Sequence, residues 1–216
     1  SVISTISSSL KIKKEMNILD DKEFYEALQS INRTSQHLSN TIDDFRNFFS
    51  PNKEMNKFYV SQLIKKSKDL IKSRFDKFNI KVIENIDDIE ILSYQNELFQ
   101  VILNLFSNSI DVLSSNEIED KIIHIKIYQD ENNLCIEFLD NGGGIKDEFI
   151  NRVFEPYFTT KHKSQGTGIG LYMSLQIVTK HLNGEISVKN DTFIENNIAY
   201  FGAKFTILLP IHLQKN

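Results

Sequence analysis

The sequence predicts an α+β protein: an N-terminal antiparallel helical hairpin, forming a four-helix bundle in a dimer, followed by an α/β sandwich with a mixed, largely antiparallel sheet. Two observations predict this division. The first 50 residues contain neither glycine nor proline, and their apolar residues repeat at helical spacing. After Pro51, helix-like and strand-like segments intermix, and short turns join strand pairs. We therefore expect a helical hairpin over residues 1–51 and a second domain over residues 52–216.

A single apolar stripe marks the second helix of the hairpin. Its members advance in steps of three and four, with Ser35 as the only polar interruption: Phe24, Leu28, Ile31, Leu38, Ile42, Phe45 and Phe49. This spacing is a heptad seam. Asp20 and Glu23 can form a capping box at its start, and Pro51 stops the helix at its end. A seam this long predicts a homodimer; a hairpin that folds only on its own second domain is the alternative.

The first helix of the hairpin carries a shorter matching stripe of Ile3, Ile6 and Leu10, close to the first residue, Ser1. We expect the sequence to be a fragment of a longer protein, with this helix starting upstream.

The second domain combines helices and strands in an order that can be read from residue periodicity. Helices are predicted over residues 58–78, 95–115 and 171–183. Strands are predicted over residues 80–86, 90–93, 121–130, 133–141, 184–191 and 200–210, with an irregular stretch from 142 to 170. Because the strands are short and turn-linked, the helices should lie on one face of the sheet.

Composition excludes several classes of protein. The net charge of −4, from 29 acidic and 25 basic residues, gives no general attraction to nucleic acid, so we expect no nucleic-acid partner. No apolar run approaches the ~20 residues that span a bilayer. The single cysteine, Cys135, cannot form an internal disulfide, which favours a reducing compartment. We expect this portion to be cytoplasmic, with any membrane anchor elsewhere in the full-length protein.

The predicted helix over residues 95–115 has one polar stripe on an otherwise apolar surface. At about 100° per residue, Glu97, Asn104, Asn108 and Asp111 fall within about 60° of arc. A buried polar stripe needs partners, and amide and carboxylate oxygens suit Mg²⁺. The stripe alone is equally consistent with a solvated helix face.

Two glycine-rich segments follow. In "DNGGGI", Asp140 stands beside three glycines, and its carboxylate can accept a hydrogen bond from an exocyclic amine; Asn-Gly is also an ordinary turn signal. In "KHKSQGTGIGL", lysines precede alternating glycines that lead into a helix, and the free amides of a helix N-terminus bind phosphate. Neither a P-loop nor a Rossmann fingerprint is present.

Four segments in this order, "NLFSNSID", "DNGGGI", "FEPYFTTK" and "GTGIGLY", resemble the N, G1, F and G2 boxes of sensor histidine kinases, within the wider family of gyrase, Hsp90 and MutL type ATPases. The resemblance covers about residues 53–211. The seamed hairpin before it resembles the dimerisation and histidine-phosphotransfer domain of these kinases.

The resemblance implies ATP and Mg²⁺ as cofactors. It makes Asn108 the metal ligand and, with Asn104 and Lys161, part of the catalytic set. Asp140 should bind the adenine amine, helped by Thr206 through water, and Asp111 should lie near the sugar. The implied nucleotide-binding residues are Asn104, Asn108, Asp111, Asp140, Gly142, Gly144, Ile145, Thr160, Lys161, Gly166, Thr167, Gly168, Ile169, Gly170, Leu171 and Thr206.

The resemblance also implies transfer of the γ-phosphoryl group of ATP to a histidine, and from there to an aspartate of a response regulator receiver domain. The acceptor histidine should lie about two turns upstream of Ser1, and an upstream sensor domain should belong to the full-length protein. Two alternatives are a non-catalytic dimerisation module with a regulatory nucleotide pocket and a gyrase-type ATP hydrolase. Asn104 disfavours hydrolysis, because it stands where hydrolases place a general-base glutamate, and an amide cannot deprotonate water.

Overall fold

The computed structural model describes residues 2–48, 54–160 and 167–212, which divide into two compact units. One unit holds the two N-terminal helices together with Tyr157–Gly168, and the other holds the strands and the remaining described helices.

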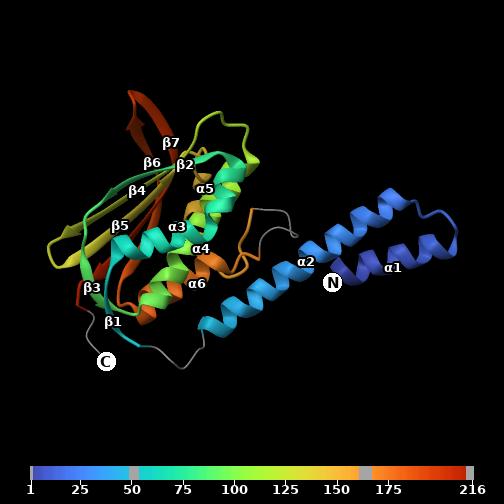
Figure 1. Ribbon diagram of the computed structural model, residues 1–216, viewed down its shortest axis with the longest axis horizontal. Helices are drawn as coiled ribbons and strands as arrows, with labels where there is room; N and C mark the ends of the chain where they lie inside the picture. Colours follow the sequence, from blue (N-terminus) through green and yellow to red (C-terminus); the bar gives the residue numbers. More distant parts are fainter. Residues whose placement is uncertain (1, 49–53, 161–166, 213–216) are drawn as a thin grey trace. The chain divides into compact units, whose positions relative to one another are not determined.

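The helical unit is a hairpin. Helices α1 (Val2–Glu15) and α2 (Asp21–Phe48) run side by side in opposite directions (Figure 1). At the start of α2, the backbone N–H of Glu23 donates to Asp20 Oδ1 at 2.7 Å, which confirms the Asp20 half of the predicted capping box. The Glu23 carboxylate pairs with Lys13 of α1. The predicted stop at Pro51 lies outside the described residues.

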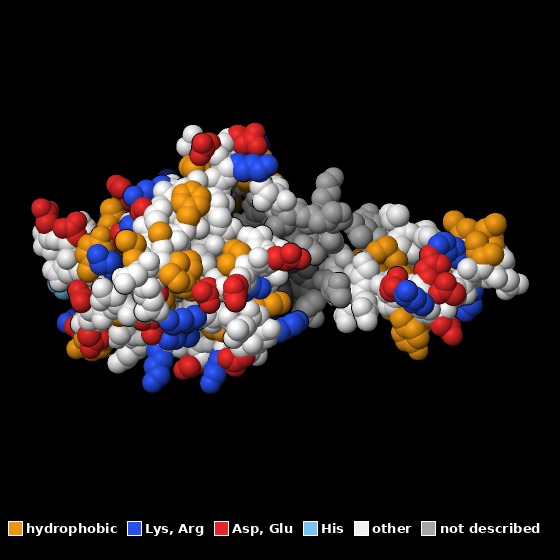
Figure 2. Space-filling view, turned by 90° about the horizontal axis from the view of Figure 1, so that it is seen from above, with side chains coloured by type: hydrophobic (Ala, Val, Ile, Leu, Met, Phe, Trp, Pro, Cys, Tyr) orange, Lys and Arg blue, Asp and Glu red, His pale blue; other side chains and the backbone are white. Residues whose placement is uncertain are grey.

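The hairpin leaves apolar side chains open to solvent in the single chain. Phe24 and Leu28, the first two members of the predicted seam, are 39% and 42% exposed. Ile12, Met16 and Ile18 are also exposed near the turn, and Figure 2 shows apolar side chains among charged ones at this end of the unit. The side chains of Leu38, Ile42, Phe45 and Phe49 lie outside the described set.

The second unit is built on a five-stranded sheet with the order β2-β4-β5-β7-β6. Its strands are β2 (Ile80–Ile86), β4 (Lys121–Asp130), β5 (Asn133–Asp140), β6 (Glu185–Glu195) and β7 (Ile198–Pro210). Strands β2 and β4 are parallel and all other neighbours are antiparallel. The predicted mixed, largely antiparallel sheet is confirmed.

Helices cover one face of this sheet (Figure 1). They are α3 (Val60–Phe78), α4 (Gln95–Ser115) and α6 (Gly170–Gln176), the last continued by a π-helical turn over Ile177–His181; the short α5 (Asp147–Ile150) follows the loop after β5. Phe75 of α3, Phe106 of α4 and Phe138 of β5 meet edge to face, with ring centroids 5.5 and 5.0 Å apart. This aromatic chain fixes α3 and α4 against the sheet.

Helix α3 begins at Val60, two residues later than the predicted start at residue 58. Residues Asn56–Tyr59 instead form β1, which pairs antiparallel with β3 (Glu90–Ser93) in a separate two-stranded sheet. Phe58 is buried opposite Ile91, so packing overrides helical spacing at this end.

The hairpin of β6 and β7 is longer than predicted. Strand β6 continues to Glu195 rather than ending at residue 191, and β7 begins at Ile198 rather than at residue 200. Asn196 and Asn197 form its two-residue turn with φ of 51° and 63°. Consecutive left-handed residues are typical of a type I′ turn, and Asn tolerates them, so the Asn-Asn pair was a turn signal that the sequence prediction missed.

Candidate functional site

The polar stripe of α4 faces the start of α6. Asn104 Nδ2 donates to Ser174 Oγ at 2.8 Å, and Ser174 is buried on α6. A Cβ on Gly170 would lie 2.3 Å from Asn104 Oδ1, so only glycine allows the first turn of α6 to approach this amide so closely. The structure therefore brings together Asn104 and Gly170, two predicted site residues 66 positions apart.

Asn108 lies one turn further along α4 and has a buried amide nitrogen. Among the described residues, none accepts a hydrogen bond from Asn108 Nδ2. Leaving a buried donor unpaired costs about 1–3 kcal/mol, and such groups in folded proteins call for an explanation. A phosphate oxygen could accept the hydrogen bond of Asn108 Nδ2, and the amide oxygen of Asn108 could coordinate Mg²⁺. The residue thus fits a metal–nucleotide site.

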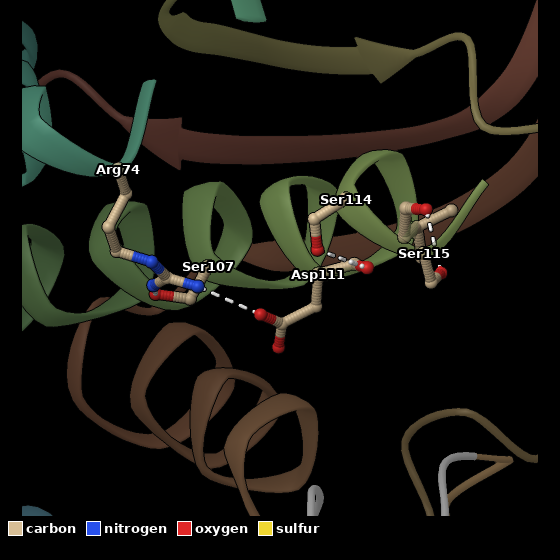
Figure 3. A network of polar contacts seen from close by, with 6 residues as sticks. Arg74, Ser107, Asp111, Ser114 and Ser115 are labelled. Carbon is tan, nitrogen blue, oxygen red and sulfur yellow. Dashed lines mark hydrogen bonds and ion pairs between the residues drawn. The ribbon is translucent and has the colours of Figure 1, made fainter. Parts of the chain in front are cut away.

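Asp111, the last member of the stripe, is held by a residue that the sequence prediction missed. Arg74 of α3 donates to Asp111 Oδ1 at 2.8 Å and to Ser107 Oγ at 3.1 Å (Figure 3). Both charged side chains are 38% exposed, so the pair contributes little to stability. Its effect is to fix the direction of the Asp111 carboxylate beside the amide stripe.

Asp140 ends β5 in a buried position, with only 4% of its surface exposed. Its Oδ1 accepts from the Gly142 N–H at 3.0 Å and its Oδ2 from Ser109 Oγ of α4 at 3.2 Å. Burial raises the pKa of the Asp140 carboxyl, and hydrogen bonds from the Gly142 and Ala203 amides and from Ser109 partly oppose this shift. A buried carboxyl so near the glycine loop and α4 is suited to read a polar group of a ligand.

Five further predicted nucleotide-binding residues of this unit lie close to Asp140 in sequence or at the start of α6. Gly142 is buried beside Asp140, and Gly144, Ile145, Ile169 and Leu171 are half-buried on the loop after β5 and at the start of α6.

Thr206 does not join the site. It pairs with Glu137 of β5, and because side chains alternate along a strand, it points to the opposite face of the sheet from Asp140. The β7 residue beside Asp140 is Ala203, whose N–H bonds to the carboxyl.

The predicted nucleotide-binding residues between positions 160 and 168 are described only in part. Lys161 and Gly166 lie outside the described residues. Thr160, Thr167 and Gly168 belong to the other compact unit, where Gly168 has a φ of +66°.

Gly202 of β7 is a further residue that the prediction missed, and its replacement should damage the site. A Cβ there would lie 1.7 Å from the backbone oxygen of Asp140, and backbone cannot yield as a flexible side chain can. We expect Gly202→Ala to lower stability by about 1–3 kcal/mol, or the melting temperature by roughly 5 °C, and to weaken ATP binding.

Scanning calorimetry measures the melting temperature, and titration calorimetry measures ATP affinity. Thr192→Ala, a change at an exposed position of β6, is the control, because it leaves the close approach of Gly202 to Asp140 untouched. A Gly202→Ala protein that melts like the unchanged chain would show that β7 can move away from Asp140 without cost.

Other kinds of site find no support in the parts of the chain that the structure describes. These parts hold no group of three or more His, Cys, Asp or Glu side chains arranged to bind a metal. This does not count against an amide ligand such as Asn108. No described helix is long and apolar enough to cross a membrane.

Comparison with known proteins agrees with this geometry. Residues 93–213 match the family model of histidine kinase-, DNA gyrase B-, and HSP90-like ATPases. Sporulation kinase E of Bacillus subtilis is 32% identical over 155 residues, covering 71% of this chain and 19% of that protein. The signal transduction histidine-protein kinase AtoS of Escherichia coli is 29% identical over 160 residues, covering 73% of this chain and 24% of that protein. The chain thus spans about a fifth of the length of these curated relatives.

Solved structures show the same fold. The nucleotide-free catalytic domain of histidine kinase ThkA superposes with a TM-score of 0.61 at 25% identity, over 74% of this chain and 97% of that one. Histidine kinase ThkA in complex with response regulator protein TrrA gives a TM-score of 0.72 at 22% identity, over 98% of this chain and 58% of that one. The matched family model covers more than half of the sequence and includes the polar stripe of α4, Asp140 and the glycines before α6. The chain belongs to the histidine kinase-, DNA gyrase B- and HSP90-like ATPase family, as the ATPase core of a two-component histidine kinase.

Proposed function

We propose that this chain transfers the γ-phosphoryl group of ATP to a protein histidine, rather than to water. The observation that supports this most strongly is the amide of Asn104 on α4, which lies against Gly170 at the start of α6 and stands where a hydrolase needs a carboxylate base. Asn104 cannot deprotonate water, and its Nδ2 is already committed to Ser174. Catalysis by this chain then consists of positioning and charge neutralisation around the transferred group.

The chemistry assigns a separate role to each residue. Asp140 would accept a hydrogen bond from the adenine amine in its buried pocket. Asn108 would donate its buried N–H to a phosphate oxygen and offer its amide oxygen to Mg²⁺, which would supply positive charge against the phosphates. Lys161 remains an expected phosphate contact.

The phosphate acceptor is proposed to lie upstream of Ser1. Helix α1 contains no histidine, although the family resemblance places the acceptor on the first hairpin helix. Of the described histidine side chains, His124 stacks on Phe193 in the sheet, His181 Nδ1 lies 3.0 Å from Glu97 Oε1, and His212 is exposed after β7. His37 is on α2, the second helix.

Three partners follow from this function. The γ-phosphoryl group would pass from the histidine to an aspartate of a response regulator receiver domain, a class of partner that the ThkA structure contains. A sensor domain elsewhere in the full-length protein would control the reaction. A second copy of the chain would pack against the hairpin.

We expect the chain to be a homodimer through the hairpin. Covering the exposed seam residues should contribute about 1.5–3 kcal/mol per large apolar side chain. Leu28→Glu should therefore yield monomers in light scattering, while Gln29→Glu, a change at an exposed neighbour, should leave the dimer intact. A concentration-independent monomer mass for the unchanged chain would contradict the dimer.

Phosphotransfer can be tested with radiolabelled ATP and Mg²⁺. The chain should bind ATP and remain unlabelled alone, but should phosphorylate a longer version that includes the upstream histidine, if hybrid dimers adopt the natural arrangement. The label should be acid-labile and base-stable, as phosphohistidine is.

Each other outcome supports a different function. Steady release of phosphate without protein label would favour an ATP hydrolase. ATP binding with neither reaction would favour a regulatory pocket. Label on the chain alone that disappears in His37→Gln would show that the acceptor lies on α2.

A further inference from the structure

The loop after β5 needs an external support, because most of it consists of glycine. Gly143 and Gly144 have φ of +88° and +79°. Glycine adopts these conformations freely, but it has no side chain that could hold the loop in them. Ordering such a loop costs conformational entropy, and if the loop orders only when a ligand arrives, that cost is subtracted from affinity.

The support comes from β6, through Asn190. Asn190 Nδ2 donates to the Ile145 carbonyl at 2.7 Å, and the Ile145 N–H donates to Asn190 Oδ1 at 2.8 Å. One side-chain amide thus satisfies both backbone groups of a single loop residue. The fit is close, since a Cβ on Gly144 would lie 2.6 Å from Asn190 Oδ1.

Asn190 is also in register with Asp140. It pairs with Ala203 of β7, and the Ala203 N–H donates to the Asp140 carboxyl. At the other end of the loop, Asn116 Nδ2 donates to the Gly142 carbonyl at 2.8 Å. Ala203 of β7 thus holds the Asp140 carboxyl, and its pairing partner on β6, Asn190, holds the far end of the loop at Ile145.

We infer that Asn190 is a positioning residue for nucleotide recognition: its paired hydrogen bonds to Ile145 hold the Gly142–Ile145 loop in its binding shape before ATP arrives. This inference rests on the proposed role of Asp140 and its loop in binding adenine. Asn190 itself need not touch the nucleotide.

The test compares Asn190→Ala and Asn190→Asp with the unchanged chain. Alanine removes both hydrogen bonds. Aspartate keeps the acceptor for the Ile145 N–H but turns a carboxylate oxygen toward the Ile145 carbonyl, so it should not rescue binding. Thr192→Ala, an exposed change two residues along the same strand, is the matched control. We expect ATP affinity by calorimetry to fall about tenfold in both Asn190 variants and to stay unchanged in the control.

Hydrogen exchange separates positioning from simple loss of structure. In the absence of ATP, the amides of residues 142–146 should exchange faster in Asn190→Ala, with the rest of the sheet unchanged, and saturating ATP should restore their protection. Unchanged ATP affinity together with unchanged loop exchange would overturn the inference. So would faster exchange across the whole sheet with a matching fall in melting temperature. Failure of the unchanged chain to bind ATP would instead overturn the proposed function.

Discussion

Replacing Asn108 with alanine should abolish most phosphotransfer while leaving the nucleotide-free protein as stable as before. Asn108 Nδ2 is buried, and none of the described residues accepts its hydrogen bond. Alanine removes a donor whose unpaired burial costs about 1–3 kcal/mol, which offsets the packing that the shorter side chain loses. Loss of the proposed contact of Asn108 to the metal and phosphates should lower the rate on the order of 100-fold.

Asn104→Ala is the matched comparison, one turn away on the same helix. The Asn104 amide does have a partner, so its removal leaves the buried Ser174 hydroxyl without its donor and should cost roughly 1 kcal/mol of stability. Melting curves without nucleotide measure the stability, and Mg²⁺-dependent ATP titrations with radiolabel transfer measure the function. A large drop in melting temperature for Asn108→Ala, with magnesium dependence intact, would make Asn108 a structural amide.

The difference between Asn104 and Asn108 shows what sequence motifs can and cannot predict. The spacing of four residues places both amides on one face of α4, so both were predicted as site residues. Which amide has a protein partner depends on Ser174, 70 residues further along the chain. Arg74, 37 residues before Asp111, is a similar case. Local periodicity contains no information about such pairings.

The error at Thr206 has a different physical origin. Strand side chains alternate between faces, so a shift of one residue in register moves a side chain to the opposite face of the sheet. The sequence shows that residues 200–210 form a strand but not which residue of β7 pairs with Asp140. The register places Ala203 and Gly202 there, and Gly202 is needed for close approach of two backbones rather than for a turn.

Asp140→Asn is the second change with a large expected effect. The variant keeps the size of the side chain but replaces an acceptor oxygen with a donor, which would face the adenine amine in the proposed complex. ATP affinity should fall by about 1–3 kcal/mol, the range for a hydrogen bond to a charged group, which is roughly 5- to 150-fold. Discrimination against GTP should also weaken. Unchanged ATP affinity by calorimetry would remove Asp140 from the site.

The same variant should change the pH dependence of stability without nucleotide. Burial raises the pKa of Asp140 in the folded state, so between its ordinary pKa and the raised one the folded chain binds a proton that the unfolded chain has released. The unchanged chain therefore loses stability as pH rises through this window, and the loss persists at neutral pH. Asp140→Asn cannot titrate, so it should lack this decline and be at least as stable as the unchanged chain at pH 7.

Asp191→Asn provides a control of opposite sign on the other face of the sheet. Hydrogen bonds from Lys189 and the Thr192 amide lower the pKa of Asp191, so this group stabilises the fold above its ordinary pKa and loses that effect as pH falls. Urea unfolding at several pH values should show stability gained at neutral pH in Asp140→Asn and lost in Asp191→Asn, with ATP affinity reduced only in the first. A carboxyl that weakens the fold and strengthens ligand binding is a functional group, because packing alone would favour its neutral replacement. Equal loss of stability at every pH in Asp140→Asn would identify its three hydrogen bonds as structural instead.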